Sequence, residues 1–177
     1  MKILITGASG SGTTTLAGKL AATTGFEHLD ADDFYWEKTD RPYQRKIPAD
    51  QRREALKRAF EGNVNVVVSG SLVSWGTFWE SAFDLVVYLY LPSDLRMERL
   101  RQREVDRYGS RLITDSELAQ SSKAFLDWAA QYDDPAFEGR SKVIHLNWLK
   151  KVTAPILTLD GDKPLGEKLA AVRGKML

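Results

Sequence analysis

A glycine-rich segment near the start of the chain has the composition of a phosphate-binding loop. Residues 7–15 read GASGSGTTT and follow a short apolar run, Lys2–Thr6. The spacing of Gly7, Gly12 and Thr14 matches G-x-x-x-x-G-K-[ST], in which small residues let backbone N–H groups converge on phosphate oxygens. The start of the following helix adds the positive end of its dipole. The predicted phosphate contacts come from Gly7, Ser9, Gly10, Ser11, Gly12, Thr13, Thr14 and Thr15.

One position of this segment departs from the pattern. Thr13 stands where lysine is usual, so the loop lacks the cation that would reach the outer phosphates. Thr14 supplies the hydroxyl that is expected to ligate Mg²⁺. The alternative is a glycine-rich turn followed by a threonine-capped helix with no ligand. Three glycines and three threonines exceed what such a turn needs, and a cation from elsewhere must then replace the lysine.

Carboxylates and aromatic rings follow the second predicted strand, the short segment Phe26–Leu29. Residues 30–36 read DADDFYW. A carboxylate beside a transferred phosphoryl group suits general-base chemistry or a metal site. The alternative is the acidic first turn of a helix, where the dipole favours negative charge, with the aromatic residues in the core. We assign Asp30 and Asp32 to catalysis, Asp32 also to the metal, and Asp33 and Tyr35 to the substrate.

The third apolar run, Val64–Val68, ends in Ser-Gly-Ser, where a Walker B aspartate would be expected and none is present. The metal would then be held by Thr14 and by Asp30 or Asp32, partly through water, which suits Mg²⁺. Gly70 allows a substrate to approach the backbone closely. The following aromatic segment, Trp75–Trp79, is either a wall of the pocket or core.

Four arginines step by three, four and four residues along the predicted helix Ser93–Tyr108 and so share one face. No acid lies three or four residues from Arg99, so we expect an anion against this face, and phosphate fits the guanidinium fork. The alternative is a set of surface arginines paired with local glutamates. A further cation is expected at Arg140, and a structural role at His145. The predicted phosphate or substrate contacts are Arg99, Arg103 and Arg107, which we assign to catalysis, and Arg111 and Arg140.

Strand and helix patterns alternate around these segments. Nearly continuous apolar runs separated by helices predict a parallel sheet covered on both faces, with ligands beyond the carboxyl ends of the strands. Ser93 is expected to cap its helix, and Thr114 to open the next one through a capping box with Glu117. The remaining expected strands are Asp84–Leu91 and Pro155–Leu159, and the remaining helices are Thr13–Thr24, Asp50–Glu61, 114–131 and Leu165–Val172.

The loop sequence GASGSGTTTLAGKLA resembles the phosphate loop of the nucleoside monophosphate kinase group of P-loop proteins. Its GSGTTT form is similar to the archaeal type of cytidylate kinase, which also has threonine at the lysine position. The Asp-x-Asp spacing at 30–32 resembles shikimate-kinase-like and gluconate-kinase-like enzymes. These resemblances imply ATP and Mg²⁺, an α/β doubly wound five-stranded parallel sheet, and a mobile arginine-bearing lid at about residues 107–140 with its hinge at 108–110.

The end of the fifth predicted strand resembles the D-G-x-x-P loop of monophosphate and shikimate kinases, although many turns share this pattern. The resemblance implies that its backbone borders the adenine. The residues concerned are Asp160, Gly161, Lys163 and Pro164.

Composition narrows the classes of function. The 177 residues carry a net charge of +1, no cysteine and two histidines, which argues against nucleic-acid binding, disulfides and thiolate zinc sites. We expect one cytoplasmic domain, 1–177, with no membrane partner, as a monomer or homodimer. The predicted function is phosphoryl transfer from ATP to a small-molecule acceptor, first a nucleotide or nucleoside and second a sugar acid. The alternative is a non-catalytic nucleotide sensor, which Thr13 and the missing Walker B acid favour.

Overall fold

Five parallel strands form the centre of the computed structural model, which describes residues 1–39 and 43–176. The strand order is β2-β3-β1-β4-β5, and Ile3 of the central strand lies opposite Val67 on one side and Leu85 on the other. All carboxyl ends therefore meet at one edge, which confirms the predicted sheet. The strands are β1 (Lys2–Gly7), β2 (Glu27–Asp30), β3 (Val66–Ser69), β4 (Leu85–Tyr90) and β5 (Ile156–Asp160).

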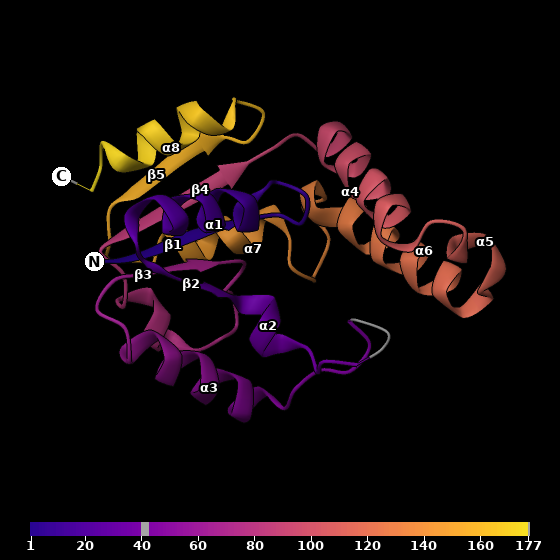
Figure 1. The fold of residues 1–177 in the computed structure, drawn as a ribbon, viewed down its shortest axis with the longest axis horizontal. Helices are drawn as coiled ribbons and strands as arrows, with labels where there is room; N and C mark the ends of the chain where they lie inside the picture. The colour runs from indigo at the N-terminus through magenta and orange to yellow at the C-terminus, as the bar shows by residue number, and fades with distance from the viewer. Residues whose placement is uncertain (40–42, 177) are drawn as a thin grey trace.

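Helices cover both faces of this sheet because successive side chains of a strand point to opposite sides. Ile3 and Ile5 belong to a core completed by α1 (Thr13–Thr24) and α8 (Leu165–Arg173). Leu4 belongs to a second core, completed by α3 (Ala49–Glu61) and α7 (Lys142–Leu149). Figure 1 shows these helices on either side of the strands. The doubly wound architecture is the predicted one.

An arm of two antiparallel helices extends from the carboxyl end of β4 (Figure 1). Met97 and Leu100 pack against Ala129, and the Ser122 hydroxyl donates a hydrogen bond of 2.7 Å to Glu104. The arm therefore begins well before residue 107, where the predicted lid starts. Gly109, with φ of 51°, ends its first helix, within the segment predicted as the hinge. The helices are α4 (Ser93–Tyr108), the short α5 (Arg111–Thr114) and α6 (Ser116–Ala130).

Two predicted helix caps are wrong. Ser93 is already helical and follows Pro92, and no side chain caps α4. Asp115 rather than Thr114 caps α6, and its carboxylate accepts a hydrogen bond of 3.1 Å from the Leu118 amide. Thr114 is not available because it closes the preceding turn, α5.

Several short elements do not appear in the predicted set, because they are too short to show a helical period. They are α5, α7, and the 3₁₀ turns η1 (Thr77–Glu80) and η2 (Gln131–Asp133). The short helix α2 (Ala31–Tyr35) is the one that the alternative interpretation of the acidic segment predicted. The strand predicted at Val64–Val68 begins at Val66, and the one predicted at Phe26 begins at Glu27.

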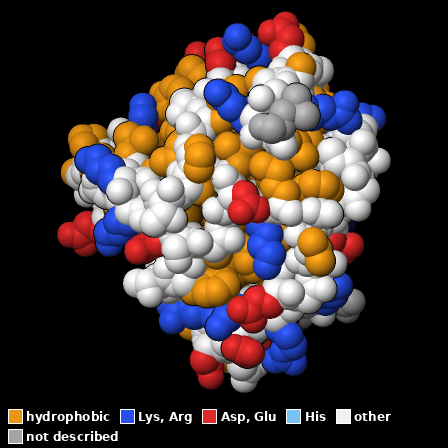
Figure 2. Space-filling view, turned by 90° about the vertical axis from the view of Figure 1, so that its left-hand side faces the viewer, with side chains coloured by type: hydrophobic (Ala, Val, Ile, Leu, Met, Phe, Trp, Pro, Cys, Tyr) orange, Lys and Arg blue, Asp and Glu red, His pale blue; other side chains and the backbone are white. Residues whose placement is uncertain are grey.

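The end of the molecule that carries the amino ends of the strands has a mixed surface. Figure 2 shows apolar side chains there interspersed with lysine, arginine and acidic residues. Val64, just before β3, is 82% exposed, and Ile156 at the start of β5 is 42% exposed. Every helix within residues 1–39 and 43–176 is too short or too polar to cross a lipid bilayer.

Gly7 provides a test of the packing between β1 and β4. A Cβ atom at this position would collide with the Leu89 carbonyl oxygen and lie 2.7 Å from the Ser11 hydroxyl. We expect Gly7→Ala to lower the free energy of unfolding by about 1–3 kcal/mol, as overpacking does. Its melting temperature, followed by circular dichroism, should fall by several degrees.

Gly166→Ala is the matched control, since a Cβ there meets nothing within 4 Å and alanine favours the helix α8. Equal melting temperatures for Gly7→Ala and the parent would contradict the close contact between the loop and β4.

Candidate active site

The glycine-rich loop takes a conformation that only small residues tolerate. Gly10 and Gly12 have φ angles of 85° and 94°, in the left-handed region. The Ser11 hydroxyl and amide both donate to the Ala8 carbonyl, at 2.8 and 3.1 Å, which closes the turn. Gly12 caps α1 without any side-chain hydrogen bond. The helix N-terminus is thereby left open toward the cleft, as phosphate binding requires.

A cleft of about 1590 Å³ lies at the carboxyl ends of the strands and brings most of the predicted site residues together. Ser11 is buried beneath the loop, and the predicted adenine-bordering residues after β5 do not line the cleft. The predicted residues that line it are Gly7, Ser9, Gly10, Gly12, Thr13, Thr14, Thr15, Asp30, Asp32, Asp33, Tyr35, Gly70, Arg99, Arg103, Arg107, Arg111 and Arg140.

The acidic turn after β2 is attached to the loop through Asp30. One Asp30 oxygen accepts a hydrogen bond of 2.8 Å from the Thr14 hydroxyl, and the other accepts one of 3.0 Å from the Asp32 amide. Asp30 therefore caps α2. Asp30 rather than Asp32 lies beside Thr14, so a hydroxyl and a carboxylate meet there as hard oxygen donors. This donor set fits Mg²⁺, which also keeps several waters.

Asp32 faces two arginines across the cleft. Its carboxylate is exposed to the cleft, yet the surrounding walls displace enough water to raise its pKa, and the Asp30 charge adds to this effect. Arg140 and Arg103 act in the opposite direction. Burial likewise lowers the pKa of Arg140, whose guanidinium lies 5.1 Å from the centroid of the Trp128 ring. A charged group with a raised pKa in a cleft marks a candidate general base.

Two arginines on this face of α4 are paired with acids, one distant in sequence and one local, which corrects the expectation of an external anion against the whole face. Arg99 binds Asp162 at 3.0 Å and donates to the Gly161 carbonyl at 3.3 Å. Arg107 lies 3.8 Å from Glu104. The arginines of this face are therefore not an unpaired stripe, although Arg103 and Arg107 line the cleft.

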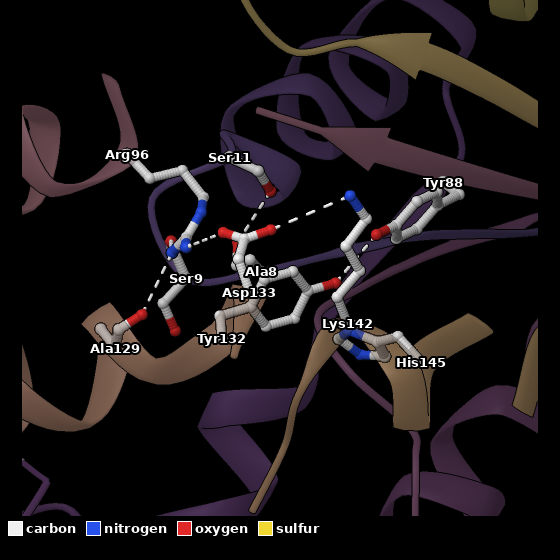
Figure 3. Close-up of polar contacts among 10 residues, drawn as sticks. All are labelled: Ala8, Ser9, Ser11, Tyr88, Arg96, Ala129, Tyr132, Asp133, Lys142 and His145. Carbon is white, nitrogen blue, oxygen red and sulfur yellow. Dashed lines mark hydrogen bonds and ion pairs between the residues drawn. The ribbon is translucent and has the colours of Figure 1, made fainter. Parts of the chain in front are cut away.

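Arg96 has a structural position (Figure 3). It is fully buried, binds Asp133 at 2.9 Å and donates to the carbonyls of Ser9 and Ala129 at 3.3 Å each. Lys142 lies 3.9 Å from the other Asp133 oxygen. Arg96 thus connects the back of the phosphate loop to the end of α6.

Aromatic rings form the wall of the cleft beyond the acidic turn. Tyr35 and Trp75 lie with their ring centroids 6.2 Å apart, and the Arg52 guanidinium lies 4.0 Å from the Tyr35 centroid. Trp36 contacts Tyr43 edge-on at 5.9 Å. Both Trp75 and Trp79 belong to the buried core, and Trp75 also lines the cleft.

Lys168 is a cleft residue that the sequence analysis missed. Its side chain is buried and donates a hydrogen bond of 2.7 Å to the Gly161 carbonyl, and burial together with Arg99 lowers its pKa. A usable signal was present in the sequence. Lys168 stands within the apolar stripe Leu165, Leu169 and Val172, where a lysine is costly unless it has a partner.

Comparison with known proteins agrees with this fold and cleft. A relative named "Uncharacterized protein YqaC" in Bacillus subtilis (strain 168) is 39% identical over 171 residues, 96% of this chain and 94% of its own length. Cytidylate kinase of Pyrococcus furiosus is 33% identical over 112 residues, 58% of this chain and 57% of its own. Shikimate kinase from Bacteroides thetaiotaomicron shares the fold, with a TM-score of 0.61 over 99% of this chain and 98% of that one at 16% identity.

The fold and the relatives are those of P-loop kinases of the nucleoside monophosphate kinase type. Residues 3–120 match the family model described as AAA domain, and the chain belongs to this family of P-loop proteins. The predicted resemblance to P-loop kinases and the predicted five-stranded parallel sheet with helices on both faces are confirmed.

Asp32 provides a pH-dependent test of the cleft electrostatics. Because the folded state raises its pKa, the ionised carboxylate costs stability, and this cost appears as the pH rises above the unfolded value of 3.8. We expect Asp32→Asn to raise the melting temperature at pH 7 by about 1–2 °C, a small gain because water in the cleft screens the charge. The gain should vanish below the unfolded pKa.

Asp33→Asn is the matched control, since it removes a neighbouring exposed charge from the same helix, α2. A lower melting temperature for Asp32→Asn than for the parent at pH 7 would show that Arg103 and Arg140 outweigh desolvation.

Proposed function

We propose that this protein transfers the γ-phosphoryl group of ATP to a small-molecule acceptor, first a nucleotide or nucleoside and second a sugar acid. The observation that carries the proposal is the single cleft in which the glycine loop, the Asp30–Asp33 turn and the arginines of α4 meet. Phosphoryl transfer needs little covalent chemistry from the protein, and this arrangement supplies what it does need, positioning and charge stabilisation.

ATP would lie with its phosphates on the loop. The backbone of residues 10–15 and the open N-terminus of α1 form an anion site, and Asp30 with Thr14 would hold Mg²⁺. When bound, Mg²⁺ supplies charge neutralisation at the phosphate oxygens. The loop after β5 does not itself line the cleft, but Arg99 and Lys168 do, and both donate to its Gly161 carbonyl. Asp160, Gly161, Lys163 and Pro164 would border the adenine beside these two side chains.

The acceptor would lie between Asp32 and the aromatic wall. Asp32, with its raised pKa, would accept the proton from the attacking hydroxyl or hold it by a hydrogen bond. Arg140 and Arg103 are the cations whose charges lower the pKa of Asp32. They would bind the acceptor and the transferred phosphoryl group. Tyr35 and Trp75 both line the cleft and give this part of it an aromatic wall, which favours an acceptor with a planar base, such as a nucleotide or nucleoside.

The arm would act as the lid. Arg103, Arg107 and Arg111 line the cleft from α4 and α5, and Gly109 lies between these two helices. Closure would bring the arginines onto the phosphates and exclude water, which otherwise hydrolyses ATP. Arg103 and Arg107 are our candidates to replace the missing loop lysine, because Arg99 is already bound to Asp162.

A non-catalytic nucleotide sensor is the second candidate, and Thr13 at the lysine position is the observation that favours it. A sensor would have no use for a carboxylate with a raised pKa beside an aromatic wall. We further propose a cytoplasmic protein that acts as a monomer or homodimer.

ADP release from ATP and Mg²⁺ tests the proposed function directly. The acceptor panel contains CMP, AMP, cytidine, adenosine and gluconate. We expect at least one acceptor to raise the rate of ADP release at least tenfold above the acceptor-free rate, and Asp32→Asn to abolish this increase. Tight ATP binding with no acceptor-dependent release would favour the sensor instead.

A pair of glycine variants tests the ATP site by thermal shift. Gly12 and Gly25 flank α1, and both have left-handed φ angles, 94° and 74°. Valine should therefore strain both positions to a similar degree. We expect saturating ATP and Mg²⁺ to raise the melting temperature of the parent and of Gly25→Val, but not of Gly12→Val, where the side chain blocks the phosphates. An equal rise for both variants would show that ATP binds elsewhere.

A further inference from the structure

A chain of hydrogen bonds runs through buried side chains from β4 to the cleft. The Tyr88 and Tyr132 hydroxyl oxygens are 2.9 Å apart, and the Tyr132 oxygen is 2.9 Å from His145 Nδ1. His145 Nε2 lies 2.6 Å from the Ser71 hydroxyl oxygen. Figure 3 shows the two tyrosine hydroxyls facing each other, with the His145 ring nearby. None of the four residues is more than 6% exposed, and of these four only Ser71 lines the cleft.

The proton positions along this chain of hydrogen bonds follow from Tyr88, the residue at its end away from the cleft. The Tyr88 hydroxyl has no other hydrogen-bond partner within the described part of the chain, and a buried O–H without an acceptor is costly. Tyr88 therefore donates to the Tyr132 oxygen. The nearby Lys142 does not change this direction, because its ammonium group can only donate hydrogen bonds and so cannot accept the Tyr88 proton. The Tyr132 proton is then directed to His145 Nδ1.

The protonation of the His145 ring determines which group donates the hydrogen bond between His145 and Ser71. Burial lowers the pKa of His145 to about 3, so the ring is neutral at physiological pH and carries a single proton. Because Nδ1 accepts from Tyr132, that proton is on Nε2. Nε2 therefore donates to the Ser71 oxygen.

The Ser71 hydroxyl proton has no acceptor among the four residues of this chain of hydrogen bonds. Ser71 makes no second side-chain hydrogen bond among residues 1–39 and 43–176. It follows Gly70, whose φ of 106° turns the backbone at the end of β3, next to Ala31 and Asp30. We propose that Ser71 donates a hydrogen bond to the phosphoryl acceptor, with Tyr88, Tyr132 and His145 as positioning residues.

This inference deepens the proposed function and rests on it, since it needs an acceptor in the cleft. The neighbouring Asp30 and Asp32 are hydrogen-bond acceptors when ionised, whereas Ser71 presents a donor with a fixed direction. It therefore selects a ligand atom with a free lone pair at this position, such as a carbonyl oxygen or a ring nitrogen of a base.

The proton arrangement can be tested without any acceptor. Long-range ¹H–¹⁵N correlation spectra distinguish the two histidine tautomers, and the chain has only His28 and His145 to assign. His145→Gln identifies the signals by their loss. We expect the Nε2–H tautomer for His145, unchanged from pH 8 to pH 5. The Nδ1–H tautomer, or a protonated ring above pH 5, would overturn the proposal.

Kinetics tests the role of Ser71, with the best acceptor of the CMP, AMP, cytidine, adenosine and gluconate panel as the probe. Ser71→Ala should raise KM for this acceptor about 3–10-fold, the effect of one neutral hydrogen bond, and leave KM for ATP unchanged. Ser71→Thr keeps the hydroxyl and should restore the parent value. Tyr132→Phe should raise the same KM, because the His145 ring then loses the hydrogen-bond partner that fixes its tautomer.

Ser69→Ala is the matched control for this series. Ser69 is also buried on β3 and also contacts a histidine, His28, at 3.0 Å, but it does not line the cleft. We expect no change in either KM. An unchanged acceptor KM in Ser71→Ala would overturn this inference and leave the proposed function intact. No turnover of any acceptor by the parent would overturn the proposed function, and this inference with it.

Discussion

The close packing of the phosphate loop against β4 and α4 is the constraint on which the rest of the site depends. A side chain at Gly7 would meet the Leu89 carbonyl, and one at Gly10 would lie 2.9 Å from the Arg96 carbonyl. The Arg96 guanidinium in turn donates to the Ser9 carbonyl. The loop is thus fixed by backbone contacts from behind, which leaves its other side free for a ligand. Any residue larger than glycine at these positions would move the loop away from the helices that carry the arginines.

The parallel sheet explains why separate segments meet in one cleft. The loop follows β1, the acidic turn follows β2, Gly70 follows β3, and the arm follows β4, and all four strands end at the same edge. Bringing these charged side chains together in one cleft lowers the stability of the folded protein. Asp32 has a raised pKa, and burial lowers the pKa of both Arg140 and Lys168. Such costs are expected where residues are kept for function rather than for stability.

The sequence was informative wherever the pattern is local. The loop, the five strands and the long helices could be predicted because glycines, apolar runs and helical periodicity occupy neighbouring positions. The helix α7 was missed because it has only eight residues and buries His145, Trp148 and Leu149 with no strong apolar face. Its contribution to the site, the bond from His145 to Ser71, joins residues 74 positions apart.

The ion pairs of Arg96 and Arg99 could not be predicted from the sequence either. Only acids three or four residues away can be judged from sequence, whereas Arg99 is neutralised by Asp162 and Arg96 by Asp133, 63 and 37 positions away. The Asp30 carboxylate caps α2, as the structural interpretation predicted, and it also accepts a hydrogen bond from Thr14, so the cap does not exclude the proposed metal site.

A crystal structure with Mg²⁺ and a non-hydrolysable ATP analogue would show whether the glycine-rich loop binds the phosphates. We expect the β- and γ-phosphate oxygens to lie within about 3 Å of backbone nitrogens between Gly10 and Thr15. We also expect the metal beside Thr14 and Asp30. A nucleotide bound elsewhere, with the loop empty or filled by the protein's own side chains, would show that this loop is not the phosphate site.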